Sequence, residues 1–215
     1  MTKESNILIM LRESIISNKF RPGEHLVERD IATAYGVSRT LVRDAFKQLG
    51  NDGLVRSVPN KGVFITSLSI EEIYEIYETR SILEAYASRL AIDRLTTEQM
   101  QRIEFLINTA AECVLQNDFQ EAHRYDHELH SILIESCGNQ HICQMTKKLW
   151  MYILRLRWKA FRIPGRSAQT VIEHKNILSA LRTKDGEKLE KLIRHHVLIA
   201  RDILLDAARS NLIDL

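Results

Sequence analysis

Helical periodicity after Ser67 restricts the fold of this chain more than any other feature of its sequence. From Ser69 to Ser210, apolar residues recur at the three- and four-residue spacing of amphipathic helices. The helices expected from this spacing are 69–95, 97–117, 119–137, 139–163, 167–184 and 186–210. Only short breaks separate them, and long amphipathic helices joined by short loops pack as an antiparallel bundle. Three prolines and eight glycines among 215 residues agree with a chain made mostly of regular structure.

A different pattern precedes the expected bundle. Helices are predicted at 7–17 and 28–35 and again after Ser38, with Gly36 in the tight turn between the second and the third. Two later runs, 53–58 and 62–66, have strand character and are joined through Pro59-Asn60-Lys61, which predicts a hairpin. We therefore expect a mainly α protein with two domains. Residues 1–67 form a winged helix-turn-helix, and residues 68–215 form an all-α antiparallel bundle of about six helices.

The third of the N-terminal helices carries a basic face opposite an apolar one. At 100° per residue, the apolar side consists of Leu41, Val42, Ala45 and Leu49. The opposite side consists of Arg39, Thr40, Arg43 and Lys47. Ser38 precedes the helix and is a suitable N-cap. A helix of this kind suits the major groove of DNA, although an ordinary solvated basic face has the same pattern.

Short motifs within residues 7–66 resemble the winged-helix domain of the GntR family of bacterial transcription regulators. In the family's order, the matching stretches are Arg21-Pro22-Gly23, Leu26-Val27-Glu28, Gly36-Val37-Ser38-Arg39, Val42-Arg43-Asp44-Ala45, Asp52-Gly53-Leu54-Val55 and Asn60-Lys61-Gly62-Val63. The resemblance implies DNA contacts from Arg29, Arg39, Thr40, Arg43 and the wing residue Gly62. Ser38, Lys47 and Lys61 complete our candidate DNA-binding set. Leu41 departs from the pattern, because these proteins often have proline there, a residue that suits the first turn of a helix.

Two histidines lie in the middle of apolar stripes on the last two expected helices. His174 and His196 each have several apolar residues within about 60° on the helix surface, whereas His195 is swung about 100° off its stripe. A histidine surrounded by apolar residues needs a polar partner, because burying an unpaired imidazole is costly.

An earlier expected helix, 119–137, carries an acidic residue and a histidine one turn apart at the edge of its apolar face. These are Asp126 and His130, whereas His127 points furthest away from that face. A divalent metal would satisfy this pair together with His174 and His196, and the ligand set is typical of zinc, nickel or manganese. The alternative is an ordinary hydrogen-bond network among four core polar residues.

Residues 69–210 resemble the FadR C-terminal domain, or FCD, which is the all-helical effector domain of the FadR subfamily. Many such domains bind a metal through Asp-x-x-x-His on one helix and single histidines on two later helices. Asp126, His130, His174 and His196 match that pattern, which implies a divalent metal cofactor: zinc, with nickel or manganese as alternatives. The helix start at Gly138-Asn139 also matches, and we take Asn139 as a candidate effector contact.

Arg80 lies at the centre of the apolar face of the first bundle helix. An arginine in that position is rarely left unpaired. One possible partner is Glu84, which lies one turn away on the same helix. The other is a ligand carboxylate, for which the guanidinium fork is well shaped. The sequence leaves both partners open, and Arg80 is our second candidate effector contact.

Composition limits where the protein works and what it binds. A net charge of +2 argues against a protein that coats nucleic acid through charge alone, but it permits a local basic patch. No apolar run is long enough to cross a bilayer, and the N-terminus lacks a signal-peptide core, so we expect a cytoplasmic protein without a membrane partner. Three cysteines without framework spacing fit reduced thiols. Cys137, His141 and Cys143 have zinc-like residue types, but their spacing fits no common site.

Together these patterns predict a DNA-binding transcription regulator and not an enzyme. Its expected partners are operator double-stranded DNA with a short inverted repeat, a small organic acid effector, and a second copy of the chain, because two-fold operators match two-fold proteins. One alternative is a metal-dependent hydrolase, with Glu135 or Glu173 as candidate general bases. The other is a constitutive DNA binder whose metal is purely structural.

Overall fold

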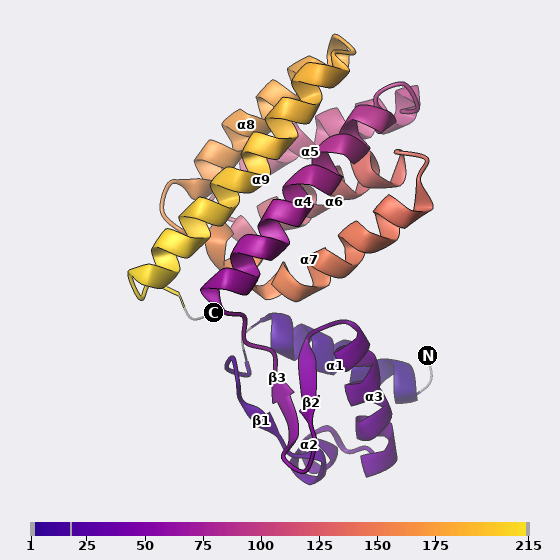
Figure 1. Ribbon diagram of the computed structural model, residues 1–215, viewed down its shortest axis with the longest axis vertical. Helices are drawn as coiled ribbons and strands as arrows, with labels where there is room; N and C mark the ends of the chain where they lie inside the picture. The colour runs from indigo at the N-terminus through magenta and orange to yellow at the C-terminus, as the bar shows by residue number, and fades with distance from the viewer. Residues whose placement is uncertain (1–2, 18, 214–215) are drawn as a thin grey trace. The chain divides into compact units, whose positions relative to one another are not determined.

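The structure, a computed structural model, describes residues 3–17 and 19–213 (Figure 1). The described residues up to Ser69, together with residues 150–155, form one compact unit, and the other described residues form a second. The elements of the N-terminal unit are α1 (Lys3–Ile16), β1 (His25–Leu26), α2 (Glu28–Tyr35), α3 (Arg39–Asn51), β2 (Val55–Val58) and β3 (Gly62–Ile65). The three expected N-terminal helices and the expected hairpin are therefore present.

The turn between α2 and α3 is built from a left-handed glycine and a serine cap. Gly36 has φ +65°, and its N–H bonds to the carbonyls of the last turn of α2, which closes that helix. The backbone N–H of Leu41 donates to Ser38 Oγ at 3.3 Å and so caps α3. Leu41 thus uses an N–H that proline would lack, so the start of α3 is specified by the cap instead of by proline.

The strands form a small antiparallel sheet in the order β1-β3-β2. The hairpin pairs Val55 with Ile65 and Val58 with Gly62, and β1 adds to the other edge with His25 opposite Phe64. The hairpin was predicted, but β1 was missed, because two residues are too few to show a periodicity of two. The helices pack on this sheet through a core that includes Leu11, Val42, Leu49 and Ile65, all completely buried.

The second unit is the helical bundle. Its helices are α4 (Ile70–Ala91), α5 (Thr97–Leu115), α6 (Phe119–Glu135), α7 (Gln140–Phe161), α8 (Arg166–Arg182) and α9 (Gly186–Arg209). Helices α4 and α9 lie side by side, and α5 contacts both α6 and α8 (Figure 1). The predicted fold class, a winged helix-turn-helix followed by an all-α bundle, is confirmed, and the boundaries differ by only a few residues.

Side-chain caps explain where several bundle helices begin. Thr96 and Gln99 form a capping box at α5, and Asp118 and Asp185 cap α6 and α9 through the backbone N–H three residues on. Asn139 Oδ1 accepts hydrogen bonds from two N–H groups in the first turn of α7, those of residues 141 and 142. Within the described part of the chain, no helix combines the length and the apolar character needed to cross a membrane.

Candidate functional site

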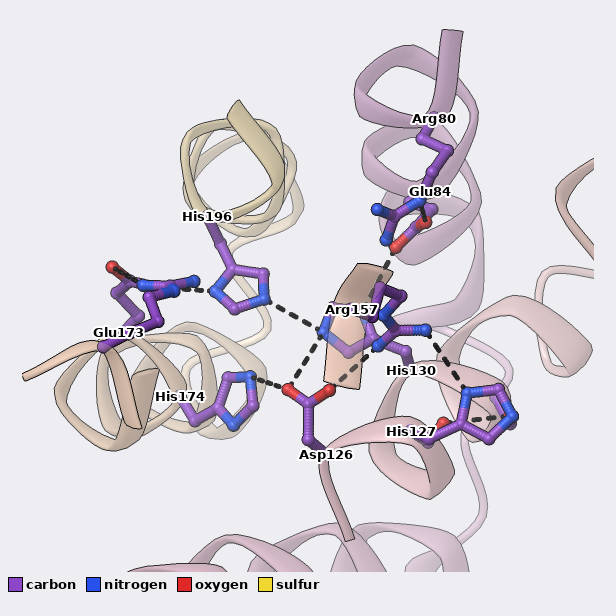
Figure 2. A network of polar contacts seen from close by, with 11 residues as sticks. Arg80, Glu84, Asp126, His127, His130, Arg157, Glu173, His174 and His196 are labelled. Carbon is purple, nitrogen blue, oxygen red and sulfur yellow. Dashed lines mark hydrogen bonds and ion pairs between the residues drawn. The ribbon is translucent and has the colours of Figure 1, made fainter. Parts of the chain in front are cut away.

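Four polar side chains from three helices converge inside the bundle (Figure 2). Asp126 and His130 come from α6, His174 from α8 and His196 from α9, and all four are buried. One ligand atom from each lies within 4.8 Å of the others. The i, i+4 spacing places Asp126 and His130 on one face of α6, so a single helix supplies half of the cluster.

The distances show which atoms face the centre. His130 Nε2 lies 3.2 Å from His196 Nε2, and His174 Nε2 lies 3.4 Å from Asp126 Oδ1. His130 Nε2 is also 4.0 Å from the same carboxylate oxygen. Three imidazole nitrogens of the same type and one carboxylate oxygen therefore surround a common point.

Two outer carboxylates orient two of these imidazoles. His130 Nδ1 lies 3.2 Å from Glu84 Oε2, and His196 Nδ1 lies 2.6 Å from Glu173 Oε2. A carboxylate favours the tautomer that carries its proton on Nδ1, which leaves the Nε2 lone pair directed at the centre. Carboxylate–histidine pairs of this kind are the usual second layer around a protein metal site.

The donor set fits a cation better than it fits an ordinary hydrogen-bond network. With Nδ1 protonated on both rings, the two Nε2 lone pairs of His130 and His196 face each other across 3.2 Å, which is unfavourable without a proton or a cation between them. His174 Nε2 is buried and makes no hydrogen bond within the described residues. A divalent metal would satisfy both requirements, and three imidazoles with one carboxylate are suitable ligands for zinc, nickel or manganese.

The electrostatics hold these groups in the protonation states that bind metals. Burial opposes ionisation of Asp126, but attraction from Arg157 and the neighbouring histidines together outweighs it and places the pKa of Asp126 well below its usual value. Burial likewise opposes ionisation of Glu173, yet the contacts with His196 and Arg166 together lower its pKa to about 2. Burial lowers the pKa of His174 and of His196. Ionised carboxylates and neutral imidazoles are the forms that coordinate a cation.

Each carboxylate around the cluster is paired with an arginine. Arg157 Nη2 donates to Asp126 Oδ2 at 2.8 Å, which leaves Oδ1 facing the histidines. The other two pairs are Arg80 Nε to Glu84 Oε1 at 2.7 Å and Arg166 Nη1 to both oxygens of Glu173 at 2.9 and 3.0 Å. The formal charges of these three pairs cancel. A metal at the centre would therefore leave a net positive charge, which favours an anionic ligand.

A small cavity of about 40 Å³ adjoins the cluster. Its polar lining includes Arg80, Asp126, Arg157, Thr170 and His196. A single water needs roughly 10–15 Å³ measured in this way, so the cavity has room for a few waters or a small organic molecule. Thr170 Oγ1 is buried without a hydrogen-bond partner within the described residues, so it is available to a ligand.

The N-terminal unit presents an exposed basic surface on α3 and the wing. The members of the candidate DNA-binding set are all exposed: Arg29, Ser38, Arg39, Thr40, Arg43, Lys47, Lys61 and Gly62. A groove lined by residues 25–29, 39, 62 and 63 brings Arg29, Arg39 and Gly62 together. Gly62 has φ +102°, and a Cβ there would collide with the ring of His25, so this part of the wing requires glycine.

One glutamate holds the two arginines of α3. Glu28 accepts from Arg43 Nε at 2.9 Å and from Arg43 Nη2 at 2.7 Å, and its Oε2 lies 3.5 Å from Arg39 Nη2. The contact lowers the pKa of Glu28, chiefly through the hydrogen bond from Arg43. The guanidinium of Arg43 is thus already oriented before any partner arrives.

Both halves of the chain match known protein families. Residues 3–65 match the family described as "Bacterial regulatory proteins, gntR family", and residues 75–198 match the "FCD domain". The chain belongs to the GntR family, with an FCD domain at its C-terminal side. It is therefore a DNA-binding transcription regulator with an FCD effector domain.

Relatives and solved structures that are similar to this GntR regulator are consistent with the family match. It is 27% identical over 187 residues to the "Uncharacterized HTH-type transcriptional regulator YdhC" of Bacillus subtilis, covering 86% of this chain and 84% of the relative. It is 23% identical over 188 residues to the "HTH-type transcriptional repressor RspR" of Escherichia coli, covering 87% and 82%. The structure of "E. coli McbR/YncC" has the same fold, with a TM-score of 0.81, 18% identity, and coverage of 97% and 99%.

The structure also locates the two candidate effector contacts of this GntR regulator and the two histidines expected to point away from the core. Arg80 lines the cavity and is also paired with Glu84. Of the two partners that the sequence left open, the structure therefore shows Glu84. Asn139 is exposed, caps α7 and is not among the cavity-lining residues, so its side chain has a structural role at this helix start. His195 is exposed, as expected. His127 was expected to point away from the cluster, yet its Nδ1 lies 3.4 Å from Arg157 Nη1.

Both candidate general bases of this regulator are engaged. Glu173 contacts Arg166 and His196, and the exposed Glu135 accepts from Lys147 Nζ at 2.6 Å. Sequence reasoning missed Arg157, although its position, with Trp150, Ile153, Ala160 and Phe161 within about 60° on α7, repeats the signal that identified Arg80. It also missed Arg166, at the first position of α8, and Thr170, for which the periodicity has no distinguishing signal.

Proposed function

We propose that this GntR regulator binds operator DNA as a homodimer and that a small organic acid, bound beside a divalent metal in the FCD domain, controls that binding. In this proposal residues 1–67 form the DNA-binding domain, and residues 68–215 form the effector-binding and dimerisation domain. Operator contacts come from Arg29, Ser38, Arg39, Thr40, Arg43, Lys47, Lys61 and Gly62. The metal ligands are Asp126, His130, His174 and His196, and the metal is zinc, with nickel or manganese as alternatives.

The observation that carries the metal assignment is the convergence of four buried ligand atoms within 4.8 Å, backed by Glu84 and Glu173. A metal bound here would supply a positive charge and open coordination positions for an anion. The chain's own residues orient the imidazoles, neutralise the outer carboxylates and shield the cluster from bulk water.

The metal is tested by elemental analysis of freshly purified protein and three variants. His174→Ala and His196→Ala should lose the metal and melt at a lower temperature, because a metal that binds only the folded chain stabilises it. The matched control is His195→Ala, one residue from a proposed ligand but exposed, which should keep its metal. Unchanged metal content in both ligand variants would end the proposal.

An acidic effector follows from the charge balance around the cavity. The three arginine–carboxylate pairs are neutral together, so the metal charge is uncompensated until an anion binds. Arg80 lines the same cavity and contacts Glu84 through its Nε, and we expect its terminal nitrogens to bind the carboxylate of the effector.

The effector is tested by titrating operator binding with a set of small mono- and dicarboxylic acids. At least one acid should change operator affinity in the metal-loaded protein and fail to do so after chelation. Arg80→Lys should weaken that response, because lysine keeps the charge next to Glu84 but lacks the fork. An acid response of equal size in metal-free protein would contradict a metal-linked effector site.

A homodimer is supported by two features. One recognition helix reads only a few base pairs, so operator specificity needs two. Tyr74, Ile82 and Tyr86 lie along one side of α4 and are 46%, 49% and 47% exposed, an unusual share of apolar surface for a bundle helix. Native mass spectrometry should report a dimer, and Ile82→Glu should weaken it. A monomer at micromolar concentration would contradict this part of the proposal.

A further inference from the structure

Two cysteines meet where α6 ends and α7 begins, away from the histidine cluster. Cys137 Sγ lies 3.7 Å from Cys143 Sγ, and Cys137 is buried whereas Cys143 is partly exposed. Both are free thiols, and among the described cysteines this is the pair in sulfur–sulfur contact. In the sequence, these two cysteines and His141 have residue types that bind zinc, but their spacing fits no common zinc site. In the described part of the chain, the group whose ligand atoms lie together is the Asp126 cluster.

The local backbone holds the two sulfurs in place. Asn139 N–H donates to Cys137 Sγ at 3.3 Å, and Cys143 Sγ donates to the carbonyl oxygen of Ile134 at 3.1 Å. The turn between them contains Gly138 at φ +73°, a conformation that lets the chain reverse within a few residues. A disulfide needs the sulfurs at about 2.05 Å, so the pair has to close by about 1.7 Å through side-chain rotation.

We propose that Cys137 and Cys143 are an oxidation site at which a hydroperoxide forms an intramolecular disulfide. Burial raises the pKa of the partly exposed Cys143, so its minor thiolate form is the one that attacks the terminal oxygen of the hydroperoxide and breaks the O–O bond. The products are the sulfenic acid of Cys143 and an alkoxide, which takes up the proton that the thiol released and becomes the alcohol.

Cys137 then resolves the sulfenic acid. Its sulfur attacks Cys143 Sγ, the S–O bond breaks, and hydroxide leaves with the Cys137 proton as water. Overall, two thiols are oxidised by two electrons, and one hydroperoxide is reduced to an alcohol and a water. The buried position of Cys137 suits this second step, because it meets the neighbouring sulfur more readily than a reagent in solution.

The cross-link would join the end of α6 to the first turn of α7. Helix α6 carries Asp126 and His130, and α7 carries Arg157, which holds Asp126. Oxidation at this turn therefore cross-links α6, which carries Asp126 and His130, to α7, which carries the arginine paired with Asp126. It would give the regulator a redox input separate from any acid effector.

The experiment uses the full chain with Cys113→Ser, so that Cys137 and Cys143 are its remaining thiols. The protein is treated with excess tert-butyl hydroperoxide, alkylated and digested with trypsin. No lysine or arginine lies between Arg124 and Lys147, so both cysteines fall in one peptide, 125–147. This peptide should lose two hydrogen atoms and take up no alkylating reagent, at a rate independent of protein concentration.

Two outcomes would overturn the proposal. The peptide could still take up two alkyl groups after the treatment, or the product could be a covalent dimer whose rate rises with protein concentration. A second variant, Cys137→Ser in the same background, checks the order of attack. It should accumulate a sulfenic acid on Cys143 that dimedone traps, whereas Cys143→Ser should show at least tenfold less adduct, because Cys137 is 1% exposed. Equal labelling of the two variants contradicts the assignment of Cys143.

Discussion

An arginine–glutamate pair occurs in each unit of this regulator, and the two pairs differ in burial. Arg43 and Glu28 make two short hydrogen bonds on the surface of the N-terminal unit, where their side chains are 57% and 24% exposed. Arg80 and Glu84 make one of similar length inside the bundle, where their side chains are 4% and 1% exposed. The contacts have similar geometry, yet their contributions to stability differ.

The two pairs contribute differently to stability because solvent reaches only the surface pair. At the surface, water solvates either partner when the pair opens, so the pair adds little stability and Arg43 stays available to a new anion. In the core, neither charge can exist alone, because removing one partner leaves the other desolvated. We therefore expect the exposed pair to orient Arg43 for the proposed contact with DNA, and the buried pair to be a condition for folding.

The largest expected effect comes from Arg80→Leu. It leaves the Glu84 carboxylate buried without its arginine, which should cost about 3–5 kcal/mol of unfolding free energy. Denaturant unfolding of wild type and variant measures it. Adding Glu84→Gln should recover much of the loss, because a neutral amide is far cheaper to bury than a stranded charge. A variant as stable as wild type would remove the distinction between the two pairs.

Arg43→Ala tests the exposed pair through binding. It should weaken specific operator binding by about 5- to 150-fold, the size of a lost bidentate contact to a base, and weaken binding to random DNA less. The midpoint of thermal unfolding should move by no more than about 2 °C, as for other surface changes. Fluorescence anisotropy with operator and random duplexes checks this. Equal losses on both duplexes would make Arg43 a phosphate contact.

Glu173→Gln asks whether the buried carboxylates also tune the proposed metal site. Glutamine still accepts a hydrogen bond from His196 Nδ1 but without the charge, so the imidazole becomes a weaker ligand. Metal affinity should fall about 10- to 100-fold, as is usual for second-layer partners. Competition with a chelator measures it, and the exposed Glu135→Gln is the matched control. An unchanged affinity would reduce Glu173 to a partner of Arg166.

The smallest effect is expected for Glu28→Gln. The neutral side chain releases Arg43 and removes a negative charge from the proposed DNA-binding surface, so affinity for random DNA should rise by about threefold or more at low salt. Operator affinity should rise less, because it depends on the orientation of Arg43, and discrimination should therefore fall. Titrations at fixed ionic strength compare the two. Improved discrimination would mean that Glu28 only repels DNA.

Local pattern accounts for what could be predicted from the sequence. Helix boundaries, the Gly36 turn and the grouping of Asp126 with His130 depend on residues within one or two turns of each other, where helical geometry alone sets directions. The prediction that His174 and His196 point into the core needs only the apolar residues beside them. The two-residue strand β1 was missed because its pairing depends on β3, which lies far along the chain.

The sequence by itself determined the direction of side chains such as Arg80, His174 and His196 into the core, and only the tertiary structure decided what each one meets there. Arg157 pairs with Asp126 across 31 residues, and Glu173 contacts His196 across 23. Periodicity assigns a direction on one helix but carries no information about the rotation and height of the next. The partner of a buried charge depends on both, because a charge-assisted hydrogen bond forms only within about 3 Å. For that reason the sequence could offer Glu84, on the same helix as Arg80, as a possible partner, whereas the pairing of Arg157 with Asp126 on another helix required the structure.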